Sequence, residues 1–375
     1  MPASNGKLKR FLVNVSLVGM GFLIAFVALE VVLRFLPVNG ASKRLAVNAD
    51  HPVLRYQPNR TFTWSTEWNF RQVNQVHVNN FGFVNTQDYD TASATPLLAV
   101  VGDSYVEAPM VPFEETYGGR LAEHLGTAAR VYTFGISGAP LSQYLAYSDY
   151  ARRTFKPEAL VISVIGNDFD QSLAQYNQRE GHHLFAPDAR GVLQLTRVDY
   201  VPSAAKQFLR NFALTRYLVG NVQIERLLAQ WKYGDTEENA PARYVGNTFA
   251  QADSARVAAS RRAIDAFFDQ LPARSGLPPD QVLFVVDAMR PHSYDDEHRA
   301  LAEGSFFDLM RRAFIAQATA QGYIVIDMQQ VFEARYQAQR QRFEWSHDNH
   351  WNVYGHEVVY ESIVQSDFLT RLTQQ

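Results

Sequence analysis

Two stretches of this chain carry side chains that could act together as nucleophile and base. Gly102-Asp103-Ser104 follows the apolar run Leu97–Val101, which is typical of a buried parallel strand. Near the C-terminus, Asp348 and His350 are two residues apart, so in an extended segment both side chains project to the same side. The carboxylate can then hold the imidazole in the tautomer that a general base requires, which predicts a triad with Ser104.

Two further turns offer hydrogen-bond donors after apolar runs, Gly135-Ile136-Ser137-Gly138 and Gly166-Asn167-Asp168. In an open parallel sheet the ligand crevice lies outside the carboxyl ends of the strands, so we expect both turns to meet Ser104. The backbone amides of Ser104 and Gly138 and the side chain of Asn167 would then hold the oxyanion formed in acyl transfer.

Short apolar runs alternate with helical patterns from Leu97 onward, which predicts βαβ units and a parallel sheet with helices on both faces. We expect strands at 97–102, 130–135, 159–165, 281–288 and 323–328. Helices are expected at about 115–125, 141–155, 250–270, 305–321, 329–341 and 355–372.

Four blocks of the chain, in this order, resemble those of the SGNH (GDSL) hydrolase family over about residues 95–370: Gly102-Asp103-Ser104, Ile136-Ser137-Gly138, Gly166-Asn167-Asp168 and Asp348-Asn349-His350. The resemblance implies a flavodoxin-like three-layer α/β/α fold and esterase or acyltransferase chemistry with no metal and no cofactor. The family's serine, glycine, asparagine, aspartate and histidine fall on Ser104, Gly138, Asn167, Asp348 and His350.

The last block departs from the family's common D-x-x-H spacing, because here it reads D-x-H and His347 stands three residues before His350. The shorter spacing is similar to that of alginate O-acetylation proteins and related periplasmic members, which favours acetyl groups on polysaccharides. An α/β-hydrolase fits less well, since Val106 stands where its G-x-S-x-G elbow needs a second glycine.

The N-terminus predicts a membrane anchor. Residues 1–10 form a basic tail, and residues 11–36 are almost wholly apolar and long enough to cross a hydrocarbon core of about 30 Å. Glu30 and Arg34 are four residues apart and can pair near the interface. A cleaved signal peptide is the alternative, but its apolar region is usually only about 7–15 residues long. A short basic tail favours the cytoplasmic side, which places the later residues outside an inner membrane, in the periplasm.

Two segments flank or interrupt the predicted sheet domain of residues 96–375. Residues 37–95 alternate like strands at 61–64 and 73–78, with a turn at 79–82, and form a β-rich preamble. Residues 170–248 hold a predicted hairpin from His183 to Thr196 and helices around 204–218 and 221–232. An insertion of this size is expected to cap the site.

Five residues near the predicted crevice are candidates for substrate binding. Trp345 and Trp351 could stack on a sugar ring, although packing in the core is the competing interpretation. His347 flanks the triad, and Arg290 and His292 follow the fourth strand on the crevice side. His356 opens the last helix and is expected to be structural. No histidine has further ligands at a recognised metal spacing, so no metal site is predicted.

Composition narrows the class of protein. The chain has 375 residues, of which 47% are hydrophobic and 19% charged, so it can bury a sizeable core. The net charge of −3 and the absence of basic blocks argue against nucleic-acid binding. With no cysteine, the chain has neither disulfides nor thiolate sites.

These observations predict a serine esterase that acts on ester-substituted glycans or other envelope acyl esters, with envelope polysaccharide machinery as a partner. One alternative is an O-acyltransferase that passes the acyl group from Ser104 to a sugar hydroxyl. The other is a catalytically silent domain that binds glycan at the membrane, against which the full set of motif residues argues.

Overall fold

The computed structural model describes residues 4–40, 42–225, 227–228, 244–290 and 292–373. The chain forms two compact units. The first comprises Met1–Ser42, Phe62–Gln75 and Ser203–Gly234, and the second comprises Lys43–Thr61, Val76–Pro202 and Asp235–Gln375. All predicted site residues belong to the second unit.

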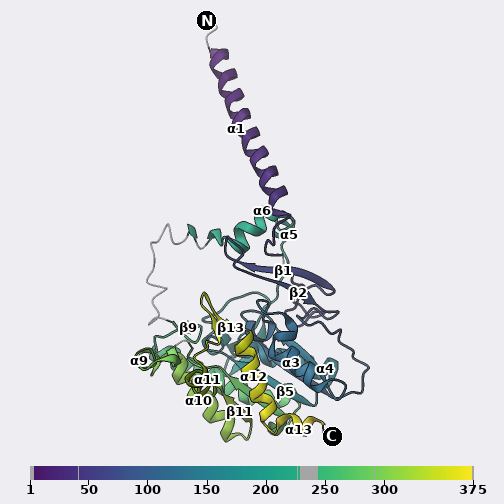
Figure 1. Ribbon diagram of the computed structural model, residues 1–375, viewed down its shortest axis with the longest axis vertical. Coiled ribbons are helices and arrows are strands. Elements are labelled where there is room, and N and C mark those ends of the chain that lie inside the picture. The colour runs from purple at the N-terminus through teal and green to yellow at the C-terminus, as the bar shows by residue number, and fades with distance from the viewer. Residues whose placement is uncertain (1–3, 41, 226, 229–243, 291, 374–375) are drawn as a thin grey trace. The chain divides into compact units, whose positions relative to one another are not determined.

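A five-stranded parallel sheet forms the centre of the second unit (Figure 1). Across the sheet the strands run β11-β10-β5-β3-β4. Numbered along the chain they follow the order 2-1-3-4-5, which is that of flavodoxin-like sheets and confirms the predicted fold. The strands are β3 (Leu97–Gly102), β4 (Arg130–Gly135), β5 (Ala159–Val164), β10 (Val282–Val286) and β11 (Ile324–Asp327).

Helices cover both faces of this sheet, because successive side chains of its buried strands point to opposite sides. Leu283 and Val285 of β10 join the core that includes α3 and α12, whereas Phe284 packs against Phe268 and Phe314. One face therefore carries α3 (Tyr117–Leu125), α11 (Met328–Gln339) and α12 (Val353–Gln365). The other carries α4 (Leu141–Phe155), α8 (Ser254–Ser275) and α10 (Phe306–Ala320).

The predicted last helix, 355–372, is wrong as a single element. The chain forms α12 and then α13 (Phe368–Thr373), with Ser366 in an extended conformation between them. The Ser366 hydroxyl donates to the carbonyl of Ile363 at 2.6 Å. Such a local side-chain bond competes with helix continuation, which accounts for the break.

The β-rich preamble is confirmed as a two-stranded sheet of β1 (Arg60–Thr66) and β2 (Gln72–Val78). In the turn that follows, Asn79 Oδ1 accepts the N–H groups of Phe81 and Phe83. Gly82 has a φ of +87°, and a Cβ there would lie 2.2 Å from the carbonyl oxygen of Tyr56. Only glycine suits this close approach.

The insertion between β5 and α8 contains the predicted hairpin. Its hairpin pairs β6 (His183–Pro187) with β7 (Leu193–Arg197), and two short strands, β8 (Tyr244–Val245) and β9 (Thr248–Phe249), pair near its end. The predicted helix 204–218 is wrong as one element: the chain forms α5 (Ala204–Leu209), α6 (Ala213–Arg216) and a π-helical turn, Tyr217–Asn221. Residues 226 and 229–232 of the predicted helix 221–232 lie outside the described residues.

A carboxylate from the N-terminal helix explains where α6 begins. Glu30 accepts the N–H groups of Ala213 and Leu214 at 3.0 and 2.9 Å, so the first amides of α6 are satisfied by a distant side chain. Glu30 also pairs with Arg34 at 2.9 Å, which confirms the predicted contact.

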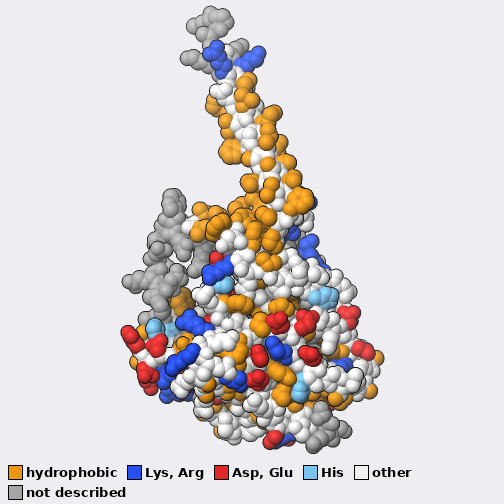
Figure 2. Space-filling view, in the orientation of Figure 1, with side chains coloured by type: hydrophobic (Ala, Val, Ile, Leu, Met, Phe, Trp, Pro, Cys, Tyr) orange, Lys and Arg blue, Asp and Glu red, His pale blue; other side chains and the backbone are white. Residues whose placement is uncertain are grey.

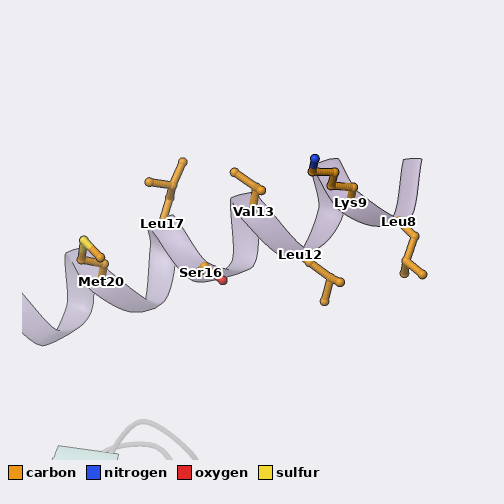
Figure 3. Close-up of a pocket in the computed structure, with 7 residues that line it drawn as sticks. All are labelled: Leu8, Lys9, Leu12, Val13, Ser16, Leu17 and Met20. Carbon is orange, nitrogen blue, oxygen red and sulfur yellow. The ribbon is translucent and has the colours of Figure 1, made fainter. Parts of the chain in front are cut away.

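The N-terminal helix α1 (Ser4–Leu33) contains a stretch, Leu8–Leu33, that is long and apolar enough to cross a membrane. Hydrophobic side chains cover this helix along its length (Figure 2). The side chains in Figure 3, among them Leu12, Val13 and Leu17, come from this one helix. The hollow between them is therefore helix surface.

Candidate active site

Ser104 opens a one-turn helix, α2 (Ser104–Glu107), directly after β3. Asp103 caps this turn, since its Oδ1 accepts the Tyr105 N–H at 2.9 Å. Its Oδ2 lies 3.2 Å from the Ser104 hydroxyl. The end of β3 thus presents the Ser104 hydroxyl on a turn whose backbone is held by the Asp103 carboxylate.

Two strand-end glycines make room for this turn. A Cβ on Gly102 would lie 2.4 Å from Cγ2 of Val106, and one on Gly135 would lie 2.8 Å from Cβ of Val106. The branched side chain of Val106 therefore fills the space that both glycines leave open. This packing accounts for valine at the position where an α/β-hydrolase elbow has glycine.

Ser104, His350 and Asp348 form a hydrogen-bonded series. Nε2 of His350 lies 2.8 Å from Oγ of Ser104, and Nδ1 lies 2.5 Å from Oδ1 of Asp348. The backbone N–H of His350 donates to the same Asp348 oxygen at 3.1 Å. These distances place a general base within reach of a hydroxyl proton, with a carboxylate that sets its tautomer.

The electrostatics of this pair favour a charged imidazolium. Burial lowers the pKa of His350, but the hydrogen bond to Asp348 and its charge outweigh burial and raise that pKa above its ordinary value. Burial raises the pKa of Asp348, yet the contacts with His350 lower it overall. Burial also raises the pKa of Asp103 to about 6, against the hydrogen bonds from Tyr105 and Ser104.

The turn after β4 presents Gly138 beside the nucleophile turn. Gly138 has a φ of +81°, and the N–H of Ala139 donates to Ile136 across the turn. The buried Glu107 at the end of α2 anchors it, because its carboxylate accepts the N–H and hydroxyl of Ser137. In the described part of the chain the Gly138 N–H has no acceptor, so it is free to bind a substrate atom.

Asn167 follows β5 and is half-buried, and its side-chain amide makes no hydrogen bond to any described residue. The next residue braces the turn: Asp168 accepts the N–H of Ile165 at 2.7 Å and the hydroxyl of Tyr144 at 2.8 Å. The three predicted turns thus all lie at the carboxyl ends of neighbouring strands, β4, β3 and β5.

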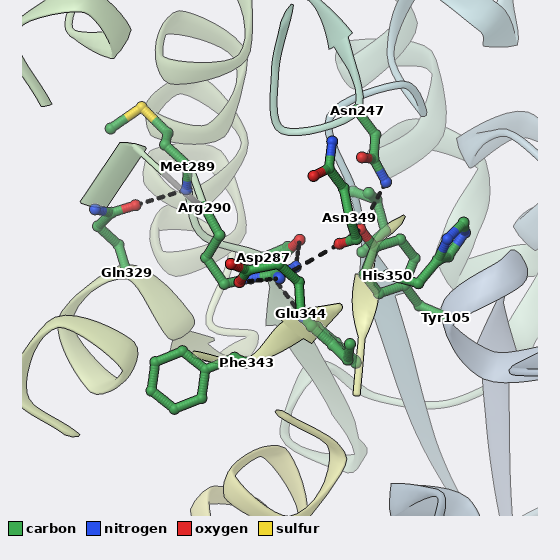
Figure 4. Close-up of polar contacts among 12 residues, drawn as sticks. Tyr105, Asn247, Asp287, Met289, Arg290, Gln329, Phe343, Glu344, Asn349 and His350 are labelled. Carbon is green, nitrogen blue, oxygen red and sulfur yellow. Dashed lines mark hydrogen bonds and ion pairs between the residues drawn. The ribbon is translucent and has the colours of Figure 1, made fainter. Parts of the chain in front are cut away.

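A buried ionic network supports the hairpin of β12 (Glu344–Trp345) and β13 (Asp348–Trp351), which carries the Asp348–His350 pair (Figure 4). Arg290 donates to both carboxylate oxygens of Asp287, at 2.7 and 3.1 Å. It also donates to Glu344 at 3.3 Å and to the carbonyl of Asn349 at 3.4 Å. Arg290 therefore ties the end of β10 to both strands of the hairpin.

Tyr105 holds the same hairpin from the nucleophile side. Its hydroxyl donates to the carbonyl of Asn349 at 3.0 Å and accepts from Nδ2 of Asn247 at 2.6 Å (Figure 4). Its ring lies 4.9 Å from the imidazole of His350, measured between centroids. Tyr105, which follows Ser104, thus positions Asn349, which precedes His350.

The predicted substrate-binding residues differ in where they lie. Trp351 is fully buried and its indole N–H donates to Asp287 at 3.0 Å, while Arg290 is enclosed by its carboxylates. His292 is buried in a short 3₁₀ turn. Trp345 and His347 are only half-buried and lie next to each other, with ring centroids 6.4 Å apart. These two are the better placed of the five to meet a substrate, and their role stays a prediction.

The sequence did not single out Glu107, Asp287 or Glu344, although each holds a site residue in place. All three are nearly wholly buried carboxylates, and each accepts hydrogen bonds from polar side chains. An acid directly after a strand is the signal that could have identified Asp287, whereas Glu107 lies five residues after β3 and has no such signal. The structural role expected for His356 agrees with its burial and with the bond from the Tyr117 N–H to its Nδ1 at 3.3 Å.

The sequence matches no protein-family model and no curated protein. Among solved structures, the chain is similar to a member of the lipolytic protein G-D-S-L family from Veillonella parvula, at 9% identity and a TM-score of 0.40, over 72% of this chain and 97% of that one. It is similar to a catalytic mutant of an acetylxylan esterase from Geobacillus stearothermophilus, at 12% identity and a TM-score of 0.38, over 74% and 95%. A two-domain esterase active on acetylated mannans matches at 12% identity and a TM-score of 0.39, over 75% of this chain and 50% of that one. The structural neighbours of this chain thus include lipolytic GDSL proteins and esterases of acetylated glycans.

Proposed function

We propose that this protein is a serine esterase in which Ser104 is the nucleophile, His350 the general base and Asp348 the residue that orients it. The observation that carries the proposal is the unbroken series from Asp348 to His350 to Ser104, at 2.5 and 2.8 Å. A strand-end serine alone has many structural explanations. Here, however, Ser104 contacts an imidazole that lies 246 residues later in the chain and is itself bound by an aspartate. A structural role for the serine does not require this combination.

In the first step, Oγ of Ser104 attacks the acyl carbonyl while His350 takes the hydroxyl proton. The oxyanion is held by the backbone amides of Ser104 and Gly138 and by the side chain of Asn167; one such donor is typically worth about 3–4 kcal/mol in the transition state. His350 then gives the proton to the departing alcohol, which leaves an acyl ester on Ser104.

In the second step, a water molecule attacks this acyl ester, His350 takes a proton from the water, and the acid departs as Ser104 regains its proton. A sugar hydroxyl could take the place of water, which would make the protein an O-acyltransferase. Asn247 of the insertion between β5 and α8 contacts Tyr105 beside the base, and exclusion of water by this insertion would support the second candidate. Product analysis with an acyl donor and an oligosaccharide separates the two; free acid as the sole product excludes transfer.

For the substrate, we propose an acyl ester on an envelope glycan, with acetyl as the acyl group. The half-buried Trp345 next to Asp348 supports this choice, because an indole beside a catalytic pair can stack on a sugar ring. Acetate release from candidate acetylated glycans tests the substrate.

We further propose that α1 is an uncleaved anchor that holds the second unit in the periplasm. The apolar stretch Leu8–Leu33, which carries Lys9 and Arg10 at its N-terminal end, supports this topology. An intact N-terminus in the mass of the purified protein, with protease sensitivity only after the outer membrane is opened, is expected. A chain shortened to the residues after the apolar stretch would point to a signal peptide.

The activity is tested with Ser104→Ala and the matched control Ser254→Ala, which changes an exposed serine at the start of α8. Ser104→Ala is expected to abolish turnover of a short-chain ester and labelling by a fluorophosphonate, with an unchanged melting curve. Undiminished turnover in Ser104→Ala would refute the assignment, and a wild-type protein that neither turns over esters nor reacts with the probe would favour a silent glycan-binding domain.

A further inference from the structure

The guanidinium of Arg179 lies directly against the turn that carries the proposed oxyanion donor. Arg179 belongs to the insertion after β5, and a Cβ built on Gly138 would stand 2.3 Å from its Nη1. The positive φ of Gly138 disfavours any other residue at that position, and the absence of a side chain leaves room for the guanidinium. A positive charge therefore stands at the edge of the site where the ester carbonyl would bind.

This charge is not used inside the protein. Arg179 is exposed, and its side chain makes no ion pair and no hydrogen bond with any residue that the structure describes. Other arginines of the second unit differ, because Arg256 pairs with Asp170 at 2.9 Å and Arg290 is held by two carboxylates. An unpaired guanidinium at the rim of a site is available to a ligand.

The surroundings of Arg179 carry a second positive charge. The buried His182 has its pKa lowered to about 4 by burial and by the charges of Arg44 and Arg179. Both arginines thus act on the same small region, while the imidazole stays neutral at pH 7. A second positive charge near Arg179 adds to the attraction of an anion.

We propose that Arg179 is a specificity-determining residue that binds a carboxylate on the sugar which bears the ester, so that the substrate is an acylated acidic glycan. The inference rests on the proposed function, because it places the ester carbonyl at Gly138. A planar guanidinium can take a carboxylate through two parallel hydrogen bonds, which a neutral sugar cannot offer. The charge belongs to the alcohol part of the ester, since Arg179 is exposed whereas Ser104 is only 9% exposed.

The test compares two acetylated oligosaccharides, an oligogalacturonide and a xylo-oligosaccharide, as substrates of the detergent-solubilised full chain. Arg179→Gln is expected to lower kcat/KM on the acidic substrate about tenfold and to leave the neutral one within about twofold, as for loss of one charge-assisted contact. Arg179→Lys should retain part of the preference. The matched control is Arg190→Gln, which removes an exposed arginine from the β6–β7 turn and should change neither value.

Two outcomes would overturn the proposal. An equal fall on both substrates would mean that Arg179 acts on the oxyanion or on the Gly138 turn, and no fall on either would mean that it takes no part in recognition. A calorimetric titration keeps the inference separate from the activity. De-acetylated oligogalacturonide should bind Ser104→Ala at least about tenfold more tightly than Ser104→Ala/Arg179→Gln. Equal binding by the two variants refutes the anion site, whether or not the wild-type protein proves to be an esterase.

Discussion

Replacement of Arg290 by glutamine should damage both the stability and the activity of this protein. Arg290 is 4% exposed and donates to Asp287, Glu344 and the carbonyl of Asn349. A glutamine of similar length cannot supply a charge or reach three partners. Two carboxylates that are 1% and 4% exposed would then be left without their cation.

The expected cost follows from this burial. Breaking a buried ion pair by removing one partner typically costs about 3–5 kcal/mol, because the remaining charge stays out of water. At roughly 2–4 °C for each kcal/mol in a domain of this size, the melting temperature should fall by on the order of 10 °C. The hairpin with Asp348 and His350 loses two of its ties, and a displacement of about 1 Å at a catalytic group can lower kcat about a hundredfold.

The assay pairs a melting curve with ester turnover measured well below the melting temperature. The matched control is Arg371→Gln, since Arg371 meets Asp280 at 3.8 Å with both side chains more than half exposed, and such a pair contributes about 0–1 kcal/mol. Arg290→Lys, which keeps the charge but not the forked geometry, should lie between the two. If Arg290→Gln melts and turns over ester as Arg371→Gln does, the buried network does not position the hairpin.

Three further perturbations test the electrostatics of the site. Asp348→Asn removes the contacts that raise the pKa of His350, and since the neutral imidazole is the base, the acidic limb of kcat/KM should move to lower pH while kcat falls roughly a thousandfold. The folded state protonates Asp103 at about 6 against an ordinary 3.8, so it binds more protons than the unfolded state between about pH 4 and 6. Denaturant unfolding of the wild-type protein should therefore show stability falling as pH rises through that range, and the fall should be smaller in Asp103→Asn, in which only Asp168 keeps a raised pKa of the two acids. Glu107→Gln loses an acceptor for the turn that presents Gly138, and kcat on a neutral ester should drop about tenfold with little change in the melting curve.

The sheet could be predicted from the chain because its strands are buried on both faces. Leu97–Val101 is apolar at every position and is followed by a glycine. This short stretch is enough to predict both the strand and its end. The contact of Asp348 with His350 was equally local, since two residues at a spacing of two share one side of β13. Patterns of this kind need no knowledge of the rest of the fold.

What could not be predicted depends on partners that are remote in sequence. The break before α6 follows from Glu30, which lies 183 residues before Ala213. Arg290 was predicted to lie in the crevice because it follows a strand. Its guanidinium is instead buried, in part by the contact with Glu344, 54 residues later. In both cases a contact between a charged group and a residue far away in the sequence determines the local structure. The neighbouring sequence does not indicate such a contact.

The β12–β13 hairpin carries both the proposed base, His350, and the carboxylate that orients it, Asp348. Because Asp348 and His350 sit on one strand with a single residue between them, any rigid movement of the hairpin carries both, and the carboxylate stays on the imidazole throughout. The contact with Ser104 belongs to another element, and such a movement would break it together with the bonds from Tyr105 and Arg290 to Asn349. The distance from His350 to Ser104 therefore depends on the position of the whole hairpin, whereas the orientation of the imidazole by Asp348 depends only on β13.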